Sequence, residues 1–138
     1  MGEKLTETAE IIEYKGVQIL FNDFSELRGQ ELADALRAST KAMIPKVASG
    51  KRDWLSVNLF ANCFFDAAAQ KTLKKVHKAM AGSFVAIADV GLSHIQSMAI
   101  ELAASLAGST VPLTFPDTVD EAKEWVVEIH KKTKNQAQ

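Results

Sequence analysis

The side chains that could do chemistry gather in short segments, each directly after a predicted strand. One segment is Asp23 and Phe24, the next is residues 62–65, the third is residues 89–94, and the fourth is Pro116 and Asp117. In open parallel sheets, ligands bind beyond the carboxyl ends of the strands. We therefore expect these segments to form one ligand-binding rim. The rim residues expected to contact a ligand are Asp23, Phe24, Asn62, Cys63, Phe64, Phe65, Ser93 and His94.

A metal ion is one candidate ligand for this rim. Asp23, Asp89 and His94 offer oxygen and imidazole groups, which suit divalent ions. Aspartate at a turn more often accepts hydrogen bonds from nearby backbone amides. We favour that role for both aspartates, and we expect no metal and no other cofactor.

Two candidate nucleophiles also fall on the rim. Cys63 paired with His94 would attack a substrate as a thiolate, which needs a nearby base. A lone cysteine beside phenylalanines is more often a small buried hydrophobe, and we favour that role. Ser93 follows Gly91, but position 95 is Ile where a hydrolase motif has its second glycine, so Ser93 is expected to cap a helix. These residues do not predict an enzyme.

The aromatic and basic side chains after the third predicted strand leave alternatives open. Either Phe64 or Phe65 lines an apolar pocket or covers a partner, or both pack against the start of the next helix. Lys71, Lys75 and Lys78 share one face of that helix. Lysines without arginine or interleaved aromatic rings are typical of a solvated surface, which we favour over an anion site.

The composition of the whole chain limits its possible functions. The chain has 138 residues, 47% of them hydrophobic, which suits one domain with one core. With 16 basic and 17 acidic side chains, the net charge is -1, which argues against nucleic-acid binding. No apolar run approaches the roughly 20 residues of a membrane span, and no apolar signal core is present. Because Cys63 is the only cysteine, no intramolecular disulfide is expected. We expect a cytoplasmic protein.

Alternating strands and helices predict an α/β fold. In residues 83–94, a buried apolar run ends in DVGLS and an apolar helical pattern follows. The pattern recurs in the order β-β-α-β-α-β-α-β-α, which predicts a layered, mostly parallel sheet of five strands with four helices. The predicted strands are 10–14, 17–21, 54–60, 83–90 and 111–115. The predicted helices are 28–44, one ended by Gly82, 93–107, and one that begins near Thr118.

Several boundaries follow from turn residues and polar tracts. Pro112 cannot donate to a neighbouring strand, so the last strand is expected at a sheet edge. Pairing between the first two strands stays open. Residues 1–8 and 131–138 are expected to be flexible, which leaves a domain over 9–130, and a polar loop is expected over 48–53.

The helix predicted over 93–107 is nearly uncharged, since Glu101 is its one formal charge. At about 100° per residue, its apolar side chains cover an arc wider than one sheet face needs. The residues expected to face the core are Ile95, Ala99, Leu102, Ala103 and Leu106. Met98 and Ile100 flank that arc and are the expected interface residues, if a partner or second copy covers the excess. The alternative is a deeply set, alanine-rich helix.

The order of these segments resembles the SpoIIAA-like, or STAS-like, family of domains related to anti-anti-sigma factors. The segments that carry the resemblance are EYKGVQILF at 13–21, DFS at 23–25, LSVN at 55–58, DVGLS at 89–93 and FPDTVDEAKEW at 115–125. Together they extend over nearly the whole predicted domain. The resemblance implies a layered domain with a mixed sheet and no enzymatic activity.

The resemblance also implies a phosphorylated serine or threonine after the third strand in the sigma-pathway branch. Here that region is residues 62–66, NCFFD, which contains no hydroxyl group to accept a phosphoryl group. We therefore expect the fold without this switch. The expected function is protein interaction or regulation with self-association, and the alternative is a carrier or sensor of a small apolar or amphipathic ligand at the rim.

Overall fold

The computed structural model of the protein describes residues 2–47 and 54–136. The strands are β1 (Glu3–Lys4), β2 (Ala9–Tyr14), β3 (Val17–Asp23), β4 (Trp54–Leu59), β5 (Phe84–Val90) and β6 (Leu113–Thr114). The helices are α1 (Gln30–Met43), α2 (Ala67–Met80), α3 (His94–Leu106) and α4 (Val119–Gln136), with a short 3-10 turn at Ile44–Lys46. The polar loop predicted over 48–53 lies outside the described residues.

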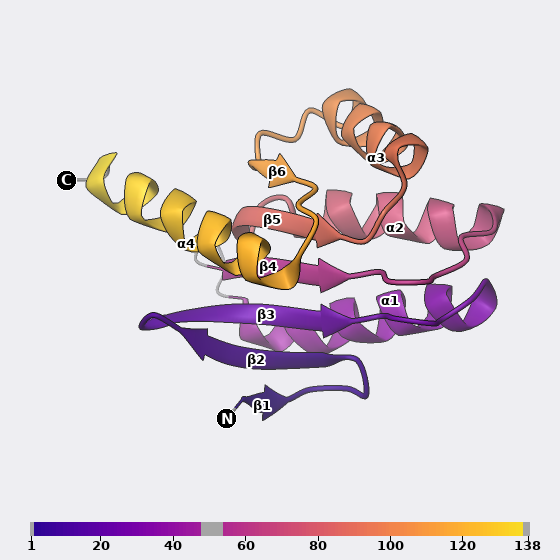
Figure 1. The fold of residues 1–138 in the computed structure, drawn as a ribbon, viewed down its shortest axis with the longest axis horizontal. Coiled ribbons are helices and arrows are strands. Elements are labelled where there is room, and N and C mark those ends of the chain that lie inside the picture. Colours follow the sequence, from indigo (N-terminus) through magenta and orange to yellow (C-terminus); the bar gives the residue numbers. More distant parts are fainter. Residues whose placement is uncertain (1, 48–53, 137–138) are drawn as a thin grey trace.

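The strands form one mixed sheet in the order β1-β2-β3-β4-β5-β6 (Figure 1). The first three strands pair antiparallel, and the pairs from β3 to β6 are parallel. The α/β class and the mostly parallel sheet are therefore confirmed. The first two predicted strands do form a hairpin, since Tyr14 faces Val17 across the turn. The sheet has six strands and not five, because Glu3 and Lys4 add a two-residue edge strand that was too short to be recognised.

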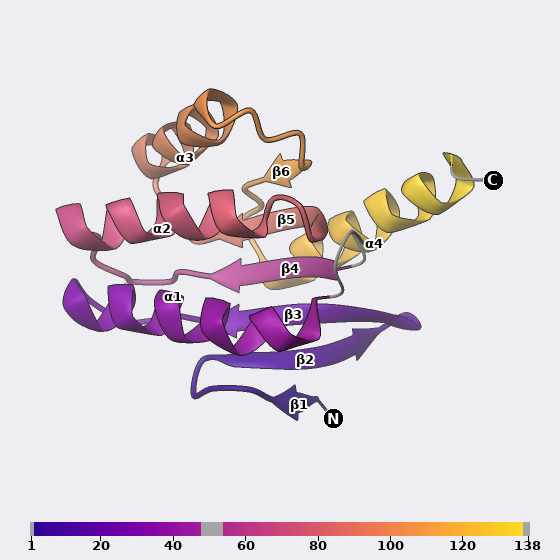
Figure 2. The ribbon, with the colours of Figure 1, turned by 180° about the vertical axis from the view of Figure 1, so that it is seen from behind.

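The helices cover the sheet from both sides. α4 lies across one face and α1 and α2 lie side by side on the other (Figures 1 and 2). Every residue of β5 is buried, which explains why its sequence is a continuous apolar run and not an alternating one. The α4 side of the core includes Leu55, Val57 and Val126, while Leu32 and Leu36 of α1 pack on the opposite side.

The buried faces of α1 and α2 follow from helical spacing. The predicted α1 face is confirmed, because Leu32, Leu36, Ser39 and Met43 are all buried. On α2 the predicted positions 69, 73 and 80 are buried and position 76 is partly buried. The structure adds two polar side chains to this face, Thr72 and His77.

Side-chain caps start the last three helices. Ser93 and Gln96 form a reciprocal capping box at α3, which confirms Ser93 as a cap. Asp66 accepts a hydrogen bond from the amide of Ala69 at the start of α2. At α4 the cap is Thr118, whose hydroxyl accepts a hydrogen bond from the Glu121 amide at 3.1 Å.

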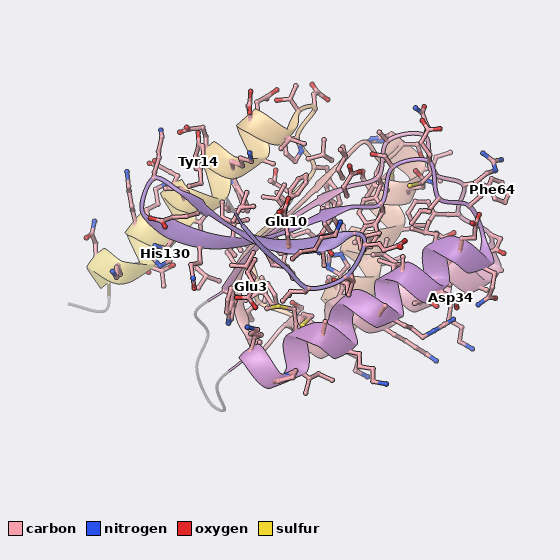
Figure 3. The ribbon with its side chains drawn as sticks, turned by 90° about the horizontal axis from the view of Figure 1, so that it is seen from below. Glu3, Glu10, Tyr14, Asp34, Phe64 and His130 are labelled. Carbon is pink, nitrogen blue, oxygen red and sulfur yellow. The ribbon has the colours of Figure 1, made fainter. Side chains whose placement is uncertain are left out.

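The first hairpin contacts α4. Tyr14 donates a hydrogen bond to Glu124 of α4, and the Lys15 ammonium lies 2.6 Å from the same carboxylate. Figure 3 shows Tyr14 beside α4 at one end of the molecule. α4 continues to Gln136, well into the tail expected over 131–138.

β6 is an edge strand, as expected from Pro112. The carbonyl oxygen of Pro112 accepts a hydrogen bond from the Ile87 amide.

The third helix is turned away from its expected orientation. Ile95, Leu102 and Leu106 were expected in the core but are exposed, and Ile100 was expected at a border but is 2% exposed. The reason is the position of α3, which stands beyond β6 and contacts α2 instead of lying flat on the sheet (Figure 1). Only the narrow side that carries Ile100 reaches the core. A charge at Ile100 would therefore disrupt the fold, and this residue is not available to an interface.

Within the described part of the chain, no helix is both long and apolar enough to cross a membrane.

Gly91 provides a test of the turn between β5 and α3. Its φ is +88°, and an added Cβ would lie 3.1 Å from the Ala61 nitrogen. We expect Gly91→Ala to lower the free energy of unfolding by roughly 1 to 2 kcal/mol in urea denaturation. Gly82→Ala is the matched control, because a Cβ there meets nothing within 4 Å, and it should change stability by less than about 0.5 kcal/mol. Equal effects of the two variants would contradict this account.

Candidate functional site

The three aromatic residues of the expected rim differ in their burial. Phe24 is 1% exposed and stacks on Phe60 with ring centroids 5.3 Å apart. Phe65 is partly buried and also packs against Phe60, with centroids 5.5 Å apart and the rings tilted by 53°. Phe64 is the outward-facing ring, 49% exposed, with the Arg28 guanidinium 5.1 Å from its centroid. Figure 3 shows Phe64 at the end of the molecule opposite Tyr14.

The polar rim residues serve local turns. The carboxylate of Asp23 accepts a hydrogen bond from the Ser25 amide at 3.0 Å, which confirms its turn role. Asn62 adopts a φ of +57° and its amide donates to Glu26 at 3.3 Å. His94 is exposed on the first turn of α3. Among the described residues, no three His, Cys, Asp or Glu side chains come close enough to hold a metal ion.

The Cys63 thiol is not poised as a nucleophile. It donates a hydrogen bond to the carbonyl oxygen of Phe24 at 2.8 Å and is only partly exposed. Loss of solvent around the sulfur raises its pKa from 9.0 to about 11. The thiol is therefore neutral near pH 7, which disfavours the Cys63–His94 pair and agrees with a small buried side chain.

A buried row of polar side chains crosses three strands instead. Asn22, Asn58 and Asp89 are aligned residues of β3, β4 and β5, each one position before its strand ends. The Asn22 amide donates to the Asn58 oxygen at 2.8 Å, and the Asn58 amide donates to the Asp89 carboxyl at 2.8 Å. Asp89 was expected to serve a turn, but it is fully buried inside the domain.

The helices α1 and α2 each add a side chain to this row of polar residues. Ser39 of α1 donates to the Asn22 oxygen at 2.7 Å, and His77 of α2 lies 3.0 Å from the second oxygen of Asp89. Ser56 of β4 also donates to Asn58, at 3.2 Å. We call this set the polar ladder: Asn22, Ser39, Ser56, Asn58, His77 and Asp89. Its members are at most 9% exposed, so each group depends on the others for hydrogen bonds.

Most of the polar ladder was not predicted, although one signal was present. A polar residue precedes the final residue of three successive parallel strands, at 22, 58 and 89. In-register parallel strands place such residues side by side. His77 follows the buried Leu73 by one helical turn, which also marks it as inward-facing.

A small cavity lies beside the polar ladder, between the sheet and the two helices. Its volume is about 40 Å³, and apolar side chains such as Leu36, Phe60 and Met80 complete its walls. One water molecule needs roughly 10 to 15 Å³ of such space, whereas small-molecule pockets usually measure about 300 to 1,000 Å³. The cavity therefore suits water and is too small for a lipid.

The outer side of α3 is the most apolar exposed surface among the described helices. Its large side chains are Ile95, Met98, Leu102 and Leu106, which are 58% to 80% exposed. We call these four residues the α3 stripe. The inward side carries Ile100 with small neighbours at 97, 103 and 104, so the bulkiest side chains of this helix point to solvent.

Comparison with known proteins identifies the fold. No protein-family model and no curated protein matches the chain. A solved structure does match: an uncharacterized protein of the DUF3478 family with a SpoIIAA-like fold, from Shewanella loihica PV-4. The match has a TM-score of 0.62 and 12% identity, and covers 86% of this chain and 91% of that one. The chain therefore has a SpoIIAA-like fold, as the sequence resemblance predicted.

The polar ladder can be tested through its pair of ionisable groups. We expect Asp89→Ala to lower the free energy of unfolding by about 3 kcal/mol, because His77 and Asn58 lose their buried partner. His77→Ala in the Asp89→Ala background should then cost clearly less than His77→Ala alone. Urea denaturation of the four proteins measures this coupling. Additive costs would contradict the pairing, and Asp23→Ala, at the exposed turn, should cost less than about 1 kcal/mol.

The Cys63 thiol gives a second test. At pH 8, iodoacetamide should modify the folded protein roughly 100-fold more slowly than the urea-unfolded protein, because the folded pKa is about 11 instead of 9.0. The folded rate should keep rising with pH until about 11. Mass spectrometry over time gives both rates, and equal rates would contradict the sheltered thiol.

Proposed function

We propose that this protein is a non-catalytic interaction or regulatory module that self-associates through the α3 stripe. The observation that carries the proposal is the exposure of four large apolar side chains on one side of one helix. Water contact with such a patch is unfavourable, and exposed apolar patches of this kind mark interaction surfaces.

The geometry of the α3 stripe suits helix pairing. Its residues follow one another at intervals of three, four and four, which keeps them within roughly 80° of the helix circumference. From Ile95 to Leu106 the stripe is about 17 Å long at 1.5 Å per residue. A stripe with these intervals can pack against another helix along its length.

A second copy of the chain is the simplest partner for this surface. In a two-fold dimer the same surface meets itself, so it must be self-complementary. Glu101, the single formal charge of α3, lies to one side of the stripe, so two stripes can meet without burying like charges. The spacing and the neutrality of the stripe both support pairing with itself.

Two other functions, catalysis and ligand transport, have less support than the interaction role. The Cys63 thiol has a raised pKa, and the His77–Asp89 pair is closed off from solvent. The cavity beside the polar ladder, at about 40 Å³, leaves no room for an apolar cargo. The interaction role is therefore favoured over the carrier role.

Leu102→Glu tests the proposed dimer. It places a charge at the middle of the α3 stripe, where the side chain is 61% exposed, so folding should be unaffected. We expect the wild type to have the mass of two 15.0 kDa chains in light scattering coupled to size exclusion, and the variant to have the mass of one.

Ala38→Glu is the matched control, since it adds the same charge at an exposed position on α1. Its mass should equal that of the wild type, and circular dichroism should show all three proteins folded. A monomeric wild type, or a dimer that survives Leu102→Glu, would exclude association through this stripe.

A further inference from the structure

A second surface with a distinct chemistry lies between the outer sides of α1 and α2. These helices run side by side over the back of the sheet (Figure 2). The open groove between them has a volume of about 380 Å³, within the range of sites that hold a ligand group. It is far larger than the cavity beside the polar ladder and shares only Thr40 and Val76 with it.

The groove combines an apolar floor with cationic walls. Ile44, which is 61% exposed, contributes apolar surface together with Val76 and Ala79. Arg37 and Lys41 project from α1, and Lys75 projects from α2. No acidic side chain is among the described residues that line it. In the sequence, the lysines of α2 have no arginine among them. In the fold, Arg37 of α1 lines the same groove as Lys75 of α2.

Arg37 is held in place across the two helices. One guanidinium nitrogen donates to the Thr72 hydroxyl of α2 at 3.2 Å, and another lies 2.6 Å from the Asp34 carboxylate on its own helix. The guanidinium therefore has a set position at one end of the groove. In the described part of the chain, neither Lys41 nor Lys75 has an ion pair within 4.0 Å, so both charges are open to an incoming anion.

We propose that this groove is a docking site for an acidic amphipathic helix of a partner protein. The segment that lines it, from Arg37 of α1 to Ile44 at the start of the 3-10 turn, extends about 10 Å, or about two helical turns. Apolar side chains of the partner, spaced by three or four residues, would enter the groove between the helices. Its carboxylates would then lie beside the cations on both walls, which gives the contact its specificity.

A helix fits this surface better than the other anionic partners. A bilayer presents a flat face, whereas here the apolar side chains lie in a hollow between two helices. Single-stranded nucleic acid stacks on aromatic rings, and no aromatic side chain is among the described residues that line the groove. The acidic side of α4 in another copy would join the groove head to tail, which builds a ring or a filament and not the two-fold pair proposed for the α3 stripe.

The test uses a fluorescein-labelled model helix with leucines on one side and glutamates on the other, and a twin in which lysine replaces glutamate. Fluorescence anisotropy with the full-length protein should show binding of the glutamate helix only. Lys75→Glu should weaken that binding at least about tenfold through charge reversal. Ala79→Phe should do the same by filling the groove without any change of charge, since Ala79 lines the groove and is exposed.

Lys74→Glu is the matched control, because Lys74 is exposed on α2 but does not line the groove. It should weaken binding by less than about threefold, as expected for a solvent-screened charge that does not contact the bound helix. Equal effects of Lys74→Glu and Lys75→Glu, or no effect of Ala79→Phe, would overturn the proposal. So would equal binding of both model helices.

Two further measurements separate this surface from its rivals. If phosphatidylglycerol vesicles bind the protein and the glutamate helix does not, the groove is a membrane contact and the proposal fails. Light scattering should show that Lys75→Glu leaves the mass of the protein unchanged, and a changed mass would assign the groove to self-association. Leu102→Glu should bind the glutamate helix as the wild type does, so failure of the α3 dimer and failure of this site can be distinguished.

Discussion

The burial of Asp89 is the constraint on which the rest of the structure depends. This carboxyl group lies on β5, a strand whose residues are all buried, and it has no exposure to solvent. Moving such a group out of water is costly unless hydrogen bonds replace those of water. Asn58 and His77 supply those bonds from the neighbouring strand and from α2. Because Asn58 in turn holds Asn22, and Asn22 is held by Ser39 of α1, one buried group fixes the relative positions of three strands and two helices.

Fixing those positions also shapes the surface. A shift of one residue between β4 and β5 would turn the Asn58 side chain to the opposite face of the sheet, where α4 packs, so the polar ladder enforces register. On the face covered by α1 and α2, Ser39 and His77 fix how these two helices pack on the strands. The outer groove is formed by the opposite sides of these same helices, so the buried hydrogen bonds and the Arg37–Thr72 bond together set the spacing of its two sides.

Sequence patterns predicted the elements of this fold better than its polar interior. The buried run at 84–90, the α1 face and the Ser93 cap all follow from local spacing and appear as expected. The orientation of α3 could not be predicted in this way, because the pattern assumes that the most apolar side faces the core, and here only Ile100 does. The pairing of His77 with Asp89 joins a helix to the following strand, and only the packed fold brings them within 3.0 Å. Whether Ser93, His94 and the other rim residues contact a ligand is still a prediction.

Both outer strands of the sheet are only two residues long, Glu3–Lys4 on one side and Leu113–Thr114 on the other. A long free strand offers unpaired amides and carbonyls to any other chain, which invites addition of strands and aggregation. Here each outermost strand can offer only a few of these groups to another chain. Both surfaces proposed above consist of helix side chains, so neither depends on adding a strand to the sheet.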